Sequence, residues 1–75
     1  MIDTQKIRSN LLYQREKCGL TQEDVAAALN VSRRKVIDWE KNPGKIKAIV
    51  FADLAKLYLC NITDFFAGLW YDRES

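Results

Sequence analysis

The sequence contains no histidine and only two cysteines. Without an imidazole, a charge switch near neutral pH and the commonest proton-transfer chemistry are not expected. Two cysteines without histidine partners also argue against a zinc site. No glycine-rich phosphate loop and no cluster of metal ligands stands out. We therefore expect a protein that is not an enzyme and that has no cofactor, metal or small-molecule ligand.

Long hydrophobic runs are also missing. No stretch approaches the roughly 20 apolar residues of a membrane span, and the N-terminus lacks the apolar segment of a signal peptide. We therefore expect a cytoplasmic protein with no membrane partner. In that compartment Cys18 and Cys60 are predicted to be free thiols, with Cys60 serving as a small hydrophobic residue of the core. The sequence alone does not decide whether they form a disulfide.

What is present suits a small globular domain. The chain has 75 residues, of which 48% are hydrophobic and 29% charged. At this size helices satisfy the backbone economically, so we predict one all-α domain over residues 1–75, with a core at about 3–67. Residues 1–47 hold ten Lys/Arg against six Asp/Glu, whereas residues 48–75 hold two against four. This asymmetry favours an anionic partner at one face of the domain.

Residues 20–40 predict two short helices joined by a tight turn. Thr21 is a suitable N-cap, and Asp24 is placed to complete a capping box. Asn30 stands where the first helix must stop, since asparagine tolerates the left-handed conformation of such a stop. Ser32 then caps the second helix. One apolar face is formed by Val25, Ala26 and Leu29, and the next by Val36 and Trp39. Helices joined so closely must cross steeply, which is helix-turn-helix geometry.

Helical patterns flank this motif on both sides. Asp3 or Thr4 can cap a helix that runs to about residue 17, with Ile7 and Leu11 inward and Gly19 at its end. Residues 48–59 predict a fourth helix whose inward residues are Ile49, Ala52, Leu54 or Ala55, and Tyr58. A short fifth helix begins at Asn61 and ends near Gly68, and Ile62, Phe65 and Phe66 from this segment close the core. The expected fold is a compact five-helix bundle.

This pattern resembles the phage repressor/Cro-type, or XRE-like, helix-turn-helix family. The matching positions are Arg15, Leu20-Thr21-Gln22, Val25-Ala26, Leu29-Asn30-Val31-Ser32, Val36, Trp39-Glu40, Leu54-Ala55-Lys56 and 61–66. They span roughly residues 5–67. The resemblance implies a lambda repressor-like fold that binds double-stranded DNA. The chain departs from the family at Gln14, where an apolar residue is usual, at Asn42, where glycine is common, and at Leu59, where glycine or asparagine is common. We expect Asn42 to adopt a left-handed turn before Pro43-Gly44 reverses the chain.

The start of the second helix of the motif carries the residues predicted to read DNA. Arg33 and Arg34 suit guanine, because a guanidinium fork meets O6 and N7 together in the major groove. Asp38 either accepts a hydrogen bond from a cytosine amino group or orients Arg34 one turn earlier. Ile37 is placed to touch a thymine methyl group. Trp39 is assigned to packing.

The resemblance also implies contacts to the DNA backbone. Gln22 and Thr21 would hold a phosphate together with the N-terminus of the first helix of the motif. Lysines around the second helix and the following loop suit flanking phosphates, namely Lys35, Lys41, Lys45 and Lys47. In the family, an arginine at the position of Arg15 pairs with a glutamate at that of Glu40, tying the first helix to the end of the DNA-reading helix.

Bulky apolar residues gather near the C-terminus, namely Phe66, Leu69, Trp70 and Tyr71. They either pack back on the core or form a subunit interface, and relatives often pair through this region. A homodimer would set two DNA-reading helices about 34 Å apart. The leading hypothesis is a Cro-like repressor of a phage or mobile element, acting on a pseudo-palindromic operator at the nucleoid of a bacterial or phage-infected cell. The alternative is an interaction protein of the same fold, such as an antirepressor, antitoxin or accessory factor, that binds a second regulator.

Overall fold

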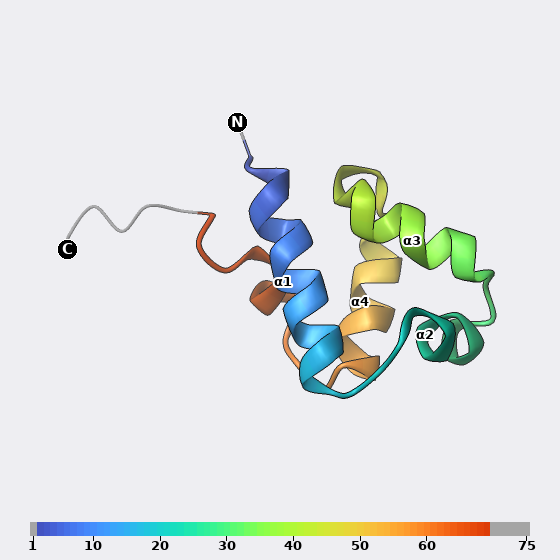
Figure 1. Ribbon diagram of the computed structural model, residues 1–75. Helices are drawn as coiled ribbons and strands as arrows, with labels where there is room; N and C mark the ends of the chain where they lie inside the picture. The colour runs from blue at the N-terminus through green and yellow to red at the C-terminus, as the bar shows by residue number, and fades with distance from the viewer. Residues whose placement is uncertain (1, 70–75) are drawn as a thin grey trace, which may run out of the picture.

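Within residues 2–69, which the computed structural model describes, the chain forms four α-helices and two 3-10 turns and no strand. The helices are α1 (Thr4–Lys17), α2 (Gln22–Leu29), α3 (Arg33–Lys41) and α4 (Ala48–Leu57), and the 3-10 turns are η1 (Pro43–Lys45) and η2 (Ile62–Phe66). Figure 1 shows α2 and α3 joined by a short turn, and η2 lying against α1 although the two are far apart in sequence. The all-α prediction is confirmed. No helix of this described part is both long and apolar enough to cross a membrane.

The helix ends follow from local side-chain chemistry. Asp3 accepts a hydrogen bond of 3.0 Å from the first turn of α1, and Ser32 accepts one of 3.1 Å from the first turn of α3. At the start of α2, Thr21 and Asp24 exchange hydrogen bonds of 2.8 and 3.1 Å in a capping box. Asn30 ends α2 in the left-handed region with φ 57°. These expectations from the sequence are confirmed.

One hydrophobic core holds the helices together. Its buried members are Ile7, Leu11, Val25, Ala26, Val36, Trp39, Ile46, Phe51, Leu54, Ala55, Tyr58 and Phe65. Phe65 is central, because its ring lies 5.8 Å from that of Phe51 and 6.1 Å from that of Tyr58, the latter edge-on. Two amide hydrogen bonds of 2.9 Å from Asn10 to the carbonyls of Phe65 and Ala67 hold η2 against α1.

The predicted inward face of α4 was partly wrong. Leu54, Ala55 and Tyr58 are buried as expected, but Ile49 is 70% exposed and Ala52 is also exposed. Phe51, which the prediction left out, is buried instead. Apolar residues occur on both sides of this helix, so its pattern alone does not fix the inward face. Phe51 determines which face of α4 turns inward, because its ring buries more apolar area than the side chain of Ile49 would and packs against Phe65.

The segments after α4 also differ from the expectation. The helix ends at Leu57, and Leu59 adopts the left-handed conformation with φ 56°. The segment predicted as a fifth helix forms the short 3-10 helix η2, so the described residues hold four α-helices and the count of five is not confirmed. Its Asp64 accepts a hydrogen bond of 2.9 Å from the backbone of Asn61. Ile62 is exposed and does not close the core, whereas Phe65 does.

Two further expectations concerned single residues. Asn42 is not left-handed but has φ −130° and ψ 67°, because the ring of Pro43 disfavours helical conformations of the residue before it. Gln14 is buried where the family has an apolar residue, and its Oε1 has no hydrogen-bond partner in the described part of the chain. Tyr13 is exposed, with the Lys17 ammonium 5.8 Å from its ring centroid.

Both cysteines are free and partly buried, and both pack against the core. The Cys18 thiol donates a hydrogen bond of 3.1 Å to the carbonyl of Tyr58, which joins the end of α1 to the end of α4. Desolvation raises the pKa of the Cys60 thiol.

Candidate nucleic-acid interface

The exposed start of α3 is the centre of the candidate site. Val36 and Trp39 are buried and anchor the helix, and this orientation leaves Arg33, Arg34 and Lys35 exposed in its first turn. Asp38 is exposed one turn later, and Ile37 is partly buried. The helix thus offers three consecutive cations, while its own dipole adds positive partial charge at the same end. Such an end suits a polyanion.

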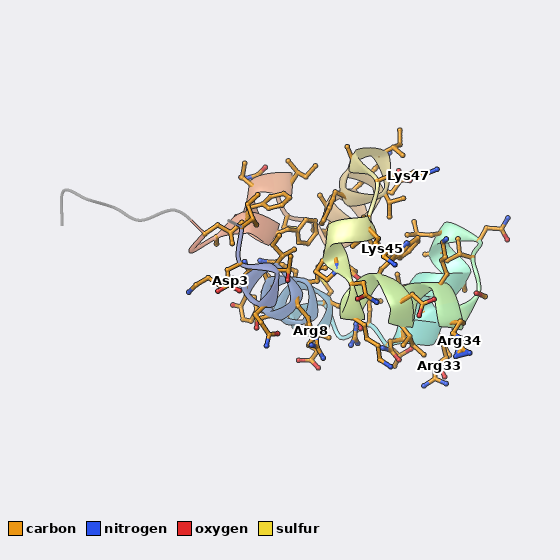
Figure 2. All side chains as sticks on the ribbon, turned by 90° about the horizontal axis from the view of Figure 1, so that it is seen from above. Asp3, Arg8, Arg33, Arg34, Lys45 and Lys47 are labelled. Atoms are coloured by element: carbon orange, nitrogen blue, oxygen red, sulfur yellow. The ribbon has the colours of Figure 1, made fainter. Side chains whose placement is uncertain are left out.

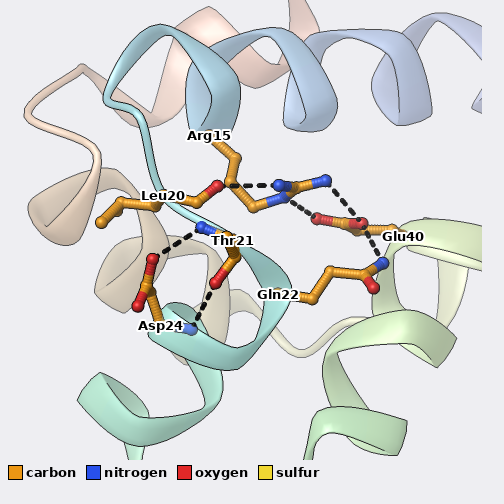
Figure 3. A network of polar contacts seen from close by, with 6 residues as sticks. All are labelled: Arg15, Leu20, Thr21, Gln22, Asp24 and Glu40. Atoms are coloured by element: carbon orange, nitrogen blue, oxygen red, sulfur yellow. Dashed lines mark hydrogen bonds and ion pairs between the residues drawn. The ribbon is translucent and has the colours of Figure 1, made fainter.

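A polar network fixes the far end of α3 (Figure 3). Arg15 Nε lies 2.7 Å from Glu40 Oε2, and the two side chains are only 11% and 9% exposed. A second guanidinium nitrogen of Arg15 donates a hydrogen bond of 2.8 Å to the carbonyl of Leu20, just before α2. One arginine of α1 therefore holds both helices of the motif. Because the pair is largely removed from water, its loss would leave a stranded charge.

The residues predicted to hold a phosphate at the start of α2 join this network. Gln22 Nε2 donates a hydrogen bond of 2.9 Å to Glu40 Oε1. The Thr21 hydroxyl accepts from the backbone N–H of Asp24. The backbone N–H of Thr21 donates to the Asp24 carboxylate, and this bond, together with the Thr21 hydroxyl, lowers the pKa of the Asp24 carboxyl. Sequence reasoning placed Gln22 at DNA but did not foresee its bond to Glu40. The hydrogen bond to Glu40 fixes the position of the Gln22 side-chain amide.

Basic side chains lie on both sides of α3. Figure 2 shows Arg33 and Arg34 toward one side of the helix, and Lys45 and Lys47 toward the other. Arg8 of α1 extends the arginine side, and it is exposed. Sequence reasoning missed Arg8. Its position seven residues before Arg15 places both arginines on one face of α1, which is the signal that would have found it.

A groove runs along the lysine side of α3. A cleft of about 340 Å³ is lined by Lys35, Asp38, Trp39, Asn42 and Lys45. A second cleft, of about 250 Å³, shares Lys35, Trp39 and Lys45 and adds Val31, Lys47 and Val50. At this edge α4 begins at Ala48, and its N-cap residue Lys47 makes no side-chain cap, so the first N–H groups of the helix add to the positive charge. Lys41 is exposed at the end of α3. The predicted lysines therefore surround α3 without forming one compact cluster.

Arg33 has a partner that the sequence did not reveal. Its Nε lies 3.4 Å from Glu23 Oε2, and the two side chains are 57% and 66% exposed. Glu23 belongs to the first turn of α2, so this contact crosses the helix-turn-helix. No local spacing rule links the two residues, because they meet only once the helices are packed.

Four residues were predicted to form a dimer interface, and two of them pack against the protein's own core. Phe66 and Leu69 are partly buried against it, and the ring of Phe66 lies 5.2 Å from that of Phe51. Both residues therefore pack back on the core, and their role in a subunit interface stays a prediction. Trp70 and Tyr71 lie outside the described residues.

Comparison with known proteins gives one match. A family model described as helix-turn-helix matches residues 11–65, a segment that holds α2, α3 and the Arg15–Glu40 pair. Searches of curated proteins and of solved structures found no match. Arg8 precedes the matched segment, whereas every cation of α3 and of the loop after it lies inside.

Proposed function

This chain belongs to the XRE-type helix-turn-helix family, and on that premise we propose that it is a sequence-specific, Cro-like repressor of transcription. Membership of this family supports a role as a DNA-binding regulator of the XRE type. The observation that carries the sharper proposal is the cationic first turn of α3, held outward by buried Val36 and Trp39. A rigid helix with an exposed basic start fits the width of the major groove.

In this proposal α3 reads the bases. Arg33 and Arg34 reach guanine through the paired donors of their guanidinium groups. Asp38, one turn after Arg34, accepts from a cytosine amino group, and Ile37 meets a thymine methyl. Val36 and Trp39 take no part in reading, since both are buried.

The flanking cations bind the DNA backbone and set the register of α3. Lys45, Lys47 and the uncapped start of α4 serve the strand on one side of α3, and Arg8 serves the other. Gln22 holds a phosphate at the start of α2. Thr21, Lys35 and Lys41 complete the proposed phosphate contacts. Each neutralised phosphate releases counterions, so the affinity is expected to fall steeply as salt rises.

In this proposal the protein acts in the cytoplasm as a homodimer, which binds an operator with approximate two-fold symmetry. It represses by occupying the promoter and catalyses no reaction. The chemistry named here requires neither a metal nor an organic cofactor, because the specificity comes from side-chain hydrogen bonds to base edges.

The test is a selection from a random duplex pool, followed by fluorescence anisotropy on the enriched duplex and on a scrambled duplex at two salt concentrations. We expect a preference for the enriched duplex of about 1,000-fold or more. We also expect the enriched sequence to show two related half-sites. Equal affinity for both duplexes would contradict sequence specificity, and a single half-site bound by a monomer would contradict the dimer.

A further inference from the structure

The contact between Arg33 and Glu23 joins the start of α3 to the start of α2. It is one of two ion pairs that residues 2–69 form, and the other is the Arg15–Glu40 pair at the opposite end of α3. The separation of 3.4 Å involves the Nε atom of Arg33. Both side chains are more than half exposed, so the pair stands at the surface where DNA is proposed to bind.

We propose that Glu23 is a positioning residue for base recognition, holding Arg33 so that its terminal guanidinium nitrogens face a guanine. This inference rests on the proposed function. A guanidinium has five N–H donors in a fixed plane. When a carboxylate engages the Nε edge, the two terminal nitrogens remain as a pair of donors that matches O6 and N7 of guanine.

The contact between Glu23 and Arg33 matters because an arginine side chain is flexible. A free Arg33 would lose rotamer freedom on binding a base, and it could equally turn to a nearby phosphate. Pairing with Glu23 removes part of that freedom before DNA arrives. The carboxylate also repels phosphate oxygens, so it disfavours backbone contacts by the same arginine. Glu23 thereby directs Arg33 toward a base.

The competing explanation is an ordinary exposed ion pair that contributes little. In that case Glu23 affects DNA binding only through its negative charge, and its removal strengthens binding to every sequence alike. The two explanations therefore differ in whether discrimination at one base pair changes, independently of overall affinity.

The experiment measures anisotropy with the full chain on the selected duplex and on variants with a single base pair replaced. Arg33→Ala first identifies the guanine that Arg33 reads, as the position where the variant loses its preference. Glu23→Gln is then compared with the wild type at that position and at the others. Glu16→Gln is the matched control, because Glu16 is exposed on α1, makes no ion pair within the described residues, and gives the same change of charge.

We expect Glu23→Gln to lower discrimination at the Arg33 position by about two- to fivefold, with the other positions unchanged. Glu16→Gln should leave discrimination intact, and Glu23→Gln in an Arg33→Ala background should have no further effect at that position. A uniform change at all positions, equal for both glutamine variants, would overturn the role of Glu23 while leaving the proposed function in place. A wild type without any preferred duplex would overturn both.

A second measurement is independent of DNA. In the free protein, the NMR signal of the Arg33 Nε–H should report an ordered group whose exchange with water is slower than that of the Arg34 Nε–H. Glu23→Gln should remove this difference. Equal exchange of the two arginines in the wild type would contradict the proposed hold on Arg33.

Discussion

The amide of Gln22 donates a hydrogen bond of 2.9 Å to Glu40 Oε1, and the same carboxylate receives the Arg15 guanidinium at 2.7 Å. The residue expected to meet a phosphate is therefore tied to the ion pair that joins α1 to α3. The Glu40 carboxylate therefore contributes both to the stability of the fold and to the placement of a proposed DNA-binding side chain. Substitutions in this network should consequently affect both folding and DNA binding, whereas substitutions at the exposed start of α3 should affect DNA binding alone.

Arg15→Ala should destabilise the fold by about 3 kcal/mol or more, because it leaves the Glu40 carboxylate buried without its cationic partner and the Leu20 carbonyl without the Arg15 donor. Urea denaturation followed by far-UV circular dichroism measures the loss. The control is Arg8→Ala, an exposed arginine on the same face of α1, which should change stability by less than about 0.5 kcal/mol.

A double variant separates the pair from its surroundings. Arg15→Met combined with Glu40→Leu should cost less than the sum of the two single changes, because no unpaired charge remains. Strictly additive losses would show that the ion pair contributes no coupling energy.

Arg34→Ala should lose about 1–3 kcal/mol of binding free energy on the preferred duplex and little on a scrambled one. Gln22→Ala should instead weaken binding to all duplexes similarly, since a phosphate contact carries no sequence information. Anisotropy titrations on both duplexes make the comparison. Lys56→Ala, an exposed cation of α4, serves as the control and should change neither. A loss of discrimination by Gln22→Ala would contradict its assignment to the backbone.

Gln14→Met should raise the free energy of unfolding by about 1–2 kcal/mol. The Oε1 atom of Gln14 is buried without a hydrogen-bond partner among residues 2–69, and an unbranched apolar side chain of similar size removes that cost. Thermal and urea denaturation measure the gain. Gln5→Met, at an exposed position of the same helix, should have almost no effect. If Gln14→Met were less stable than the wild type, the Oε1 atom of Gln14 would have a hydrogen-bond partner in solution.

Leu59→Gly should stabilise the fold by about 0.5–1 kcal/mol. Leu59 has φ 56° and is 86% exposed, so the change relieves backbone strain and loses little burial. The matched control is Lys56→Gly, within the exposed face of α4, which should lose about 1 kcal/mol because glycine is a poor helix former. Equal losses in the two variants would indicate that Leu59 carries no strain.

Alkaline pH should destabilise the protein through Tyr58. Burial is the main cause that raises the pKa of its hydroxyl above the ordinary value of 10.0, with Glu40 adding to the effect. The unfolded chain therefore releases this proton at lower pH than the folded chain does. The resulting stability is complete below pH 10.0 and declines as pH rises from there toward the folded pKa.

Denaturation at a series of pH values between neutrality and strong base measures this decline. Tyr58→Phe should flatten the pH dependence above the ordinary tyrosine pKa, whereas Tyr13→Phe, at an exposed tyrosine, should leave it unchanged. The same slope in both variants would assign the alkaline loss to other groups.

The sequence alone determined the elements whose causes are local. The caps at Thr21 and Ser32 and the stop at Asn30 depend on neighbours within a few residues, so propensity and spacing place them correctly, and they narrow the cap of α1 to Asp3 or Thr4. The apolar faces of α2 and α3 were also predictable, because each has a single apolar side. From these local facts follow the helix-turn-helix and the exposed cationic start of α3.

Tertiary structure decided whatever depends on residues far apart in the chain. The inward face of α4 was settled by Phe51 meeting Phe65, and η2 is held by Asn10 of α1. The bond from Gln22 to Glu40 and the contact between Arg33 and Glu23 likewise exist only once separate helices are packed. A sequence pattern reports periodicity along one helix, but it carries no distance between two helices. Packing supplies that distance, because the buried side chains fix how the helices cross.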